Sequence, residues 1–106
     1  MNKKKIKILH ETDSFEGELI LSVWLKGDII PGYDPDRFRM DADGYVMEYY
    51  NYGMRIKYGW EIDHIVAPDM GGASELNNLR PLQWENKLRK DNYMKYTNVI
   101  FHDNNK

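Results

Sequence analysis

Two short apolar segments in the second half of the chain constrain its fold most strongly. Residues 60–66 and 79–83 are rich in apolar side chains, and the stretch between them contains a proline and two adjacent glycines. Short runs of this kind, bounded by turn residues, are typical of β-strands joined by a loop. The polar segment that follows, residues 84–95, is predicted to be a helix. The sequence therefore predicts a strand–loop–strand–helix unit over residues 60–95, within a fold of the α+β class.

The first half of the chain is predicted to begin with a capped helix. Asp13 or Ser14 can cap a helix over residues 15–26, with two glutamates in its first turn. Gly27 stands just past the expected end, where a glycine commonly stops a helix.

The segment between this helix and the strand–loop–strand unit is predicted to be mostly irregular. Residues 28–43 contain two prolines and run into the turn sequence Asp41-Ala42-Asp43-Gly44. The two aspartates also hint at a calcium loop, but the further ligands and the distal Glu of that pattern are missing, so a plain turn is preferred. Residues 45–50, rich in aromatic side chains, are predicted to form a strand. At the termini, residues 1–12 fit a strand or a loose arm, and residues 98–102 fit a strand or a surface tail.

Length and composition narrow the possible classes of protein. A chain of 106 residues is expected to be a single domain, here residues 1–106 with a leader over 1–59. There is no cysteine, so disulfides and thiolate zinc ligands are excluded and no structural zinc is expected. No apolar run approaches the roughly 20 residues that cross a bilayer, and no apolar core follows the basic start. We therefore expect a cytoplasmic protein without membrane contact.

Charge is distributed unevenly between the two halves. The net charge of the chain is −2. Residues 1–53 carry seven basic and ten acidic side chains (7 − 10 = −3), whereas residues 54–106 carry eight and seven (8 − 7 = +1). Phosphate neutralisation supplies much of the affinity of nucleic-acid-binding proteins. Any such contact must use a local patch here, and the second half is the better candidate.

The neighbouring Asp63 and His64 are the strongest chemical signal. Hydrolysis of a phosphodiester needs a base to activate water and an electrophile to stabilise negative charge. A histidine suits the first task at neutral pH, and a hard divalent cation held by carboxylate and amide oxygens suits the second. Neighbours in a regular strand point to opposite faces. The strand is therefore expected to end or kink near Asp63.

The order of these motifs resembles the HNH nuclease family. The resemblance rests on Trp60–Val66, Gly71-Gly72, Asn78–Leu82 and the charged segment 84–90. The resemblance covers about residues 23–92. The first half looks like the leader of a bacterial and phage HNH subfamily, and this leader runs into the Asp63-His64 strand. The matching segments are Trp24–Gly27, Pro31–Pro35, Arg37–Arg39, Tyr52-Gly53, Tyr58–Ile65 and Leu82–Asn86.

The resemblance implies a ββα-metal core with an N-terminal helix and short additional strands. In that core His64 would activate water, Asp63 would bind a divalent metal, and Asn78 would tie the loop to the strand so that His64 is held in register. The following helix would supply a second metal ligand and then a basic residue, which matches Lys90.

One position departs from the family pattern. The second ligand is expected nine residues after Asn78, where this chain has Lys87, a cation that cannot bind a metal when protonated. Asn86 is adjacent, but one helical residue is a rotation of about 100°. Either the loop before the helix is one residue short and Asn86 is the ligand, or the site has lost that ligand. We prefer the first interpretation, because the Asp63-His64 pair would be costly to keep without a use.

The favoured function is that of an HNH endonuclease that depends on Mg²⁺ or Mn²⁺ and hydrolyses phosphodiester bonds in DNA. The expected contacts to the DNA backbone are Lys87, Arg89, Lys90, Arg37 and Arg39, although salt bridges with Asp34 or Asp36 are the simpler role for the last two. The alternative is a catalytically impaired HNH-like protein that binds nucleic acid or another protein. A protein partner, a homodimer or a larger assembly stays open.

Overall fold

The structure is a computed structural model that describes residues 14–104, with side-chain surroundings for residues 14–95. It is a mixed α+β domain, as predicted. Three antiparallel strands, in the order β1-β2-β3, form one sheet, and a β4–β5 hairpin forms a second. The elements in chain order are α2 (Phe15–Trp24), β1 (Asp28–Ile29), β2 (Phe38–Met40), β3 (Val46–Glu48), β4 (Trp60–His64), β5 (Leu79–Gln83) and α3 (Trp84–Asn104), with 3-10 turns at Tyr49–Asn51, Pro68–Met70 and Leu76–Asn78.

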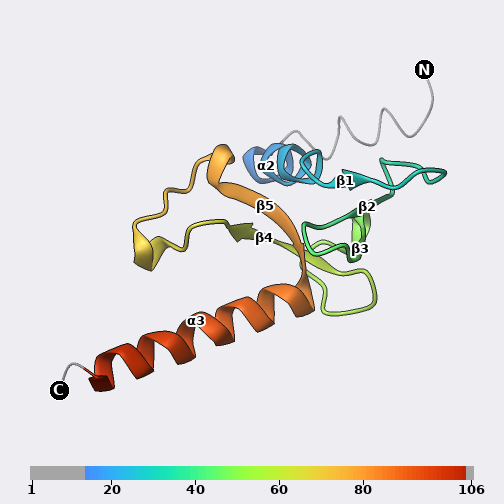
Figure 1. Cartoon of the computed structure of the whole chain (residues 1–106). Coiled ribbons are helices and arrows are strands. Elements are labelled where there is room, and N and C mark those ends of the chain that lie inside the picture. The colour runs from blue at the N-terminus through green and yellow to red at the C-terminus, as the bar shows by residue number, and fades with distance from the viewer. Residues whose placement is uncertain (1–13, 105–106) are drawn as a thin grey trace.

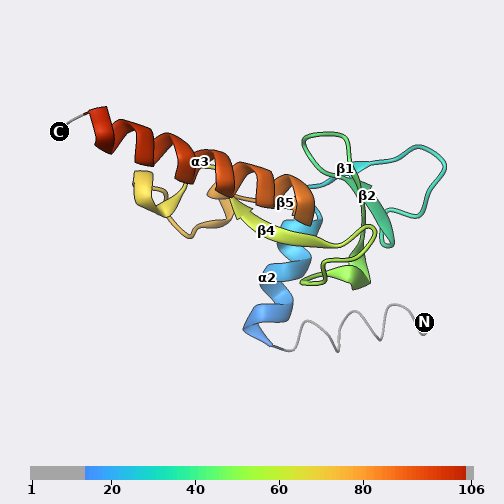
Figure 2. The same ribbon diagram turned by 90° about the horizontal axis from the view of Figure 1, so that it is seen from below.

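The β4–β5 hairpin lies between the two helices. Figure 1 shows α2 above the hairpin and α3 below it, and α2 contacts β5 while α3 contacts both strands. In the antiparallel register Trp60 faces Gln83 at one end and His64 faces Leu79 at the other. The predicted bounds of β5 are confirmed, whereas β4 stops at His64, two residues before the predicted end. Figures 1 and 2 show α3 doubling back along the hairpin and extending beyond it.

A small aromatic core joins these elements. Val23, Trp24, Met47 and Trp60 are almost fully buried, and the rings of Trp24 and Trp60 lie 5.2 Å apart. Both indoles also donate hydrogen bonds to backbone carbonyls, Trp24 Nε1 to Pro35 at 3.0 Å and Trp60 Nε1 to the residue that begins the first 3-10 turn at 3.1 Å. Each tryptophan thus fills the core and fixes a connecting segment, which is the use that a buried indole favours.

The two helix predictions have different outcomes. Ser14 caps α2 as predicted, since its Oγ accepts a hydrogen bond of 2.8 Å from the Gly17 amide, and the helix ends at Trp24, two residues early. Helix α3 runs to Asn104, so the strand or tail expected at residues 98–102 is wrong. The prediction for residues 1–12 lies outside the described residues. In the described part of the chain no helix has the length and apolar character required to cross a membrane.

The connector is more regular than predicted. It contains β1 and β2, whose two- and three-residue length leaves no alternation to detect. Arg39 is buried and donates to three backbone carbonyls in and around this segment, those of Leu25, Gly27 and Pro35, at 2.9 to 3.2 Å. The turn at residues 41–44 is confirmed: the Gly44 amide donates to the Asp41 carbonyl at 3.0 Å, and Gly44 has a φ of 82°.

Asp41 connects this turn to the start of α3. Its carboxylate is 1% exposed and accepts four hydrogen bonds. Oδ1 receives the amides of Asp43 and Tyr45, while Oδ2 receives the Gln83 amide at 3.0 Å and Asn86 Nδ2 at 2.8 Å. A buried carboxylate is stable only with such complete hydrogen bonding. Asp41 therefore fixes where α3 leaves the hairpin.

Replacing Asp41 by Ala should destabilise the protein strongly. The change leaves buried donors without an acceptor, which costs about 3 kcal/mol. Urea unfolding followed by tryptophan fluorescence measures the loss, and Asp43→Ala, in the same turn but exposed, is the matched control. Equal stability of the two variants would contradict the role given to Asp41.

Candidate functional site

Asp63 is the centre of a buried ion cluster. The residue is 2% exposed. Oδ2 accepts a hydrogen bond of 2.9 Å from Arg80 Nε, and Lys90 Nζ lies 3.1 Å from Oδ1 and 2.9 Å from Oδ2. Arg80 is the cross-strand partner of Asp63 on β5, whereas Lys90 comes from α3. One carboxylate thus joins two strands and a helix.

The path of α3 explains why Lys90 reaches Asp63. The helix starts directly after Gln83 and doubles back along the hairpin (Figure 1). Seven helical steps from Gln83 to Lys90 rise about 10 Å at 1.5 Å each, and the three strand steps from Gln83 back to Arg80 span about the same length. Lys90 is therefore level with Asp63 and Arg80, whereas Asn86 stays near the Gln83 end.

Lys90 also contacts the backbone of the neighbouring residue. Its ammonium donates to the carbonyl oxygen of His64 as well as to both Asp63 oxygens. The formal charges of the cluster are one negative and two positive, a sum of +1 (−1 + 1 + 1). A net positive cluster beside a histidine suits an anionic ligand such as a phosphate.

His64 is the last residue of β4, so the strand ends one residue after Asp63. It is half-buried, and its Nε2 lies 3.1 Å from Ser74 Oγ, within hydrogen-bond distance. Since neighbours on a strand point to opposite faces, Asp63 meets Lys90 while the His64 ring meets the loop. The two side chains share the end of one strand, and Lys90 links them through the His64 carbonyl.

Asn78 fastens the loop to the end of β4. Its Oδ1 accepts from the Val66 amide at 2.9 Å, and its Nδ2 donates to the carbonyls of Val66 and Ala73 at 3.0 and 2.8 Å. Gly72 packs so closely that an added Cβ would lie 1.8 Å from the Val66 oxygen. The loop that carries Ser74 is therefore held next to His64.

Asn86 and Lys87 are engaged elsewhere. Asn86 is buried, its Nδ2 donates to Asp41, and its Oδ1 accepts from Arg89. Lys87 Nζ forms an ion pair of 2.8 Å with Asp91 Oδ2, one helical turn further on. The structure does not bring Asn86 to Asp63, which corrects the expectation that the two share a metal.

The described residues do not fit the metal site that the resemblance implies. Both Asp63 oxygens already accept hydrogen bonds from cations, and Asn86 is held by Asp41. Within residues 14–95 no three His, Cys, Asp or Glu side chains gather into a group that could bind a metal ion. Of the two expected ligands, Asp63 alone lies in the cluster, where two cations already pair with it.

The arginines expected to contact DNA differ in accessibility. Arg39 is buried and bonded to three carbonyls, so the expectation of a phosphate contact is corrected to a structural role. Arg37 is exposed, with Nε 3.3 Å from Glu48 Oε1. Arg89 is exposed on α3 and lies over the Tyr45 ring, 5.6 Å from its centroid. Arg37 and Arg89 therefore stay available to a phosphate backbone.

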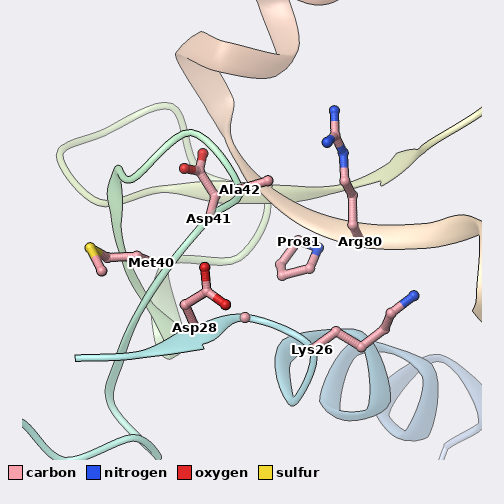
Figure 3. Close-up of a pocket in the computed structure, with 8 residues that line it drawn as sticks. Lys26, Asp28, Met40, Asp41, Ala42, Arg80 and Pro81 are labelled. Atoms are coloured by element: carbon pink, nitrogen blue, oxygen red, sulfur yellow. The ribbon is translucent and has the colours of Figure 1, made fainter. Parts of the chain in front are cut away.

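A pocket of about 80 Å³ lies between the end of α2 and β5 (Figure 3). Its polar groups serve the fold, since Asp41 is fully hydrogen-bonded and Lys26 donates to the carbonyls of Leu76 and Leu79. Figure 3 shows the Arg80 side chain directed away from Lys26. The pocket adjoins the Asp63 cluster only through Arg80 and is lined by Lys26, Gly27, Asp28, Met40, Asp41, Ala42, Arg80 and Pro81.

Sequence reasoning missed Arg80 and Ser74. The role of Arg80 can be predicted only when the hairpin register is known, because Arg80 is then the cross-strand partner of Asp63. That register depends on the loop conformation, which residue types alone did not specify. Ser74 carried no signal apart from its position in the loop.

Replacing Asn78 by Ala should loosen the loop without unfolding the domain. The change removes three hydrogen bonds of the loop, each contributing about 1 kcal/mol. Hydrogen–deuterium exchange of residues 65–76 should accelerate at least tenfold, and the neighbouring exposed Asn77→Ala is the control. Unchanged exchange in the Asn78 variant would show that its side chain does not hold the loop.

Comparison of the chain with known protein families, curated proteins and solved structures found no match, so its functional assignment rests on the residues and geometry of this site.

Proposed function

We propose that the chain is an HNH-type protein with a ββα core that hydrolyses phosphodiester bonds in DNA. The observation that carries the proposal is the position of His64: a half-buried histidine at a strand end whose backbone carbonyl accepts a hydrogen bond from Lys90, a member of a cluster with one excess positive charge. A base next to fixed cations is what attack on a phosphodiester requires. The β4–β5–α3 order agrees with the core expected for this family.

The proposed reaction is a single displacement at phosphorus. His64 takes a proton from water as the water oxygen bonds to phosphorus. The bond from phosphorus to the 3′ oxygen breaks, and that oxygen takes a proton from solvent, which leaves a 5′-phosphate and a 3′-hydroxyl. Lys90 and Arg80 stabilise the charge that develops on the phosphate oxygens. Ser74 and Asn78 act as positioning residues for the His64 ring and its loop.

Basic residues of α3 extend the proposed DNA contact. Lys87 and Arg89 precede Lys90 within one turn of α3, and Arg89 is exposed. In this proposal both contact the DNA backbone next to the scissile phosphate. Because the whole chain carries a charge of −2, binding should depend on this patch and fall steeply with salt.

A second candidate is a protein that binds nucleic acid without cutting it. Two contacts favour it: Lys87, at the expected position of the second metal ligand, pairs with Asp91, and Asn86 is held by Asp41. In this case the positive cluster would bind a phosphate of the nucleic acid, and His64 would have no catalytic role. Binding of DNA without any nicking is the result expected for it.

Replacing His64 by Ala should reduce nicking of supercoiled plasmid at least about 100-fold, because the base is removed. Circular dichroism should show an unchanged fold. The matched control is Lys57→Ala, an exposed residue in the loop before β4, at the opposite end of that strand from His64. Full nicking activity of the His64 variant would contradict the proposed reaction. Wild-type protein that binds DNA but does not nick it would favour the second candidate.

A further inference from the structure

The position of the Lys90 ammonium resembles that of a bound cation. It contacts three oxygens of one strand: both carboxylate oxygens of Asp63 and the backbone carbonyl of His64. Carboxylate and carbonyl oxygens are the ligands that hard cations such as Mg²⁺ and Ca²⁺ prefer. The protein has therefore built an oxygen-lined cation site and filled it with one of its own side chains.

Entry of a divalent ion at this place would be unfavourable. The ion would have to displace Lys90 from Asp63, which is 2% exposed, and would then lie beside the Arg80 guanidinium. Breaking a buried ion pair leaves a charge without compensation, which is strongly destabilising.

We infer that Lys90, supported by Arg80, replaces the divalent metal at Asp63, so that the site binds the phosphodiester backbone without a metal ion. The inference rests on the proposed function for its substrate, a nucleic-acid phosphate. The occupation of Asp63 by Lys90 is independent of that function. The excess charge of +1 takes the place of the metal as the group that meets the phosphate.

Calorimetric titration with Mn²⁺ tests the occupation of Asp63 directly. Wild-type protein should show no stoichiometric binding up to about 1 mM Mn²⁺, a range in which weak sites of hard cations are still detected. Lys90→Ala should bind Mn²⁺ at least tenfold more tightly than wild-type protein does. Adding Asp63→Asn to the Lys90→Ala variant should remove this binding. Stoichiometric binding to wild-type protein that Asp63→Asn abolishes would overturn the inference. The wild-type titration decides the matter even if Lys90→Ala fails to fold.

Binding of a fluorescein-labelled DNA duplex, followed by anisotropy, tests the consequence. In EDTA and in Mg²⁺ the wild-type affinities should agree within about twofold at equal ionic strength. Lys90→Gln should weaken binding about tenfold in both buffers and reduce the salt slope by about one, whereas Lys57→Gln should leave it unchanged. Loss of wild-type binding in EDTA, with recovery in Mg²⁺, would contradict a metal-free site.

The two titrations separate failure of this inference from failure of the proposed function. Protein that neither binds nor nicks DNA in any buffer has a different function. In that case the manganese titration still shows whether Lys90 or a metal occupies Asp63.

Discussion

The structure depends on one buried carboxylate. Asp63 is held by Arg80 from the facing strand and by Lys90 from the helix below, so a single charge joins β4, β5 and α3. Such a group is unstable in the interior unless it is fully paired, and here two cations compensate it. The pairing also leaves a positive charge next to His64. The contact that stabilises the fold is thus also the one that determines the chemistry of the site.

A second buried carboxylate determines where the helix begins. Asp41 accepts the Gln83 amide and the Asn86 side chain, while Gln83 Oε1 accepts the amides of Glu85 and Asn86 at 3.0 and 3.1 Å. The two bonds to Gln83 Oε1 satisfy backbone amides in the first turn of α3, where amides otherwise lack helical partners. With that end fixed, the helical rise brings Lys90 level with Asp63. Asn86 belongs to this structural network and not to the site.

Much of the fold could be predicted from the sequence, because its strongest signals are local. The turn residues of the loop and the apolar run of β5 marked the hairpin, and Ser14 marked the start of α2. The strands β1 and β2 are too short to show alternation, and their position depends on the buried Arg39. Burial of Asp41 was missed because its turn sequence is typical of an exposed loop.

The site was predicted less completely than the fold, since its partners come from three elements. Asp63 and His64 were adjacent in the sequence and Lys90 was expected as a basic residue, but the role of Arg80 required the register and the contact of Lys90 with Asp63 required the path of α3. The choice between Asn86 and Lys87 followed from a family spacing alone. The hydrogen bond from Asn86 to Asp41 is a contact across 45 residues, which no local pattern contains.

The free energy of unfolding of Asp63→Asn tests the central claim most directly. If Asp63 is the partner of two cations, the isosteric change removes its charge and should destabilise the protein by about 2 to 3 kcal/mol, with Lys90 and Arg80 left uncompensated. If Asp63 is kept for a metal at a cost to the fold, the same change should leave stability unchanged or raise it. A loss of stability in urea unfolding without metal agrees with the account, and unchanged or increased stability would contradict it.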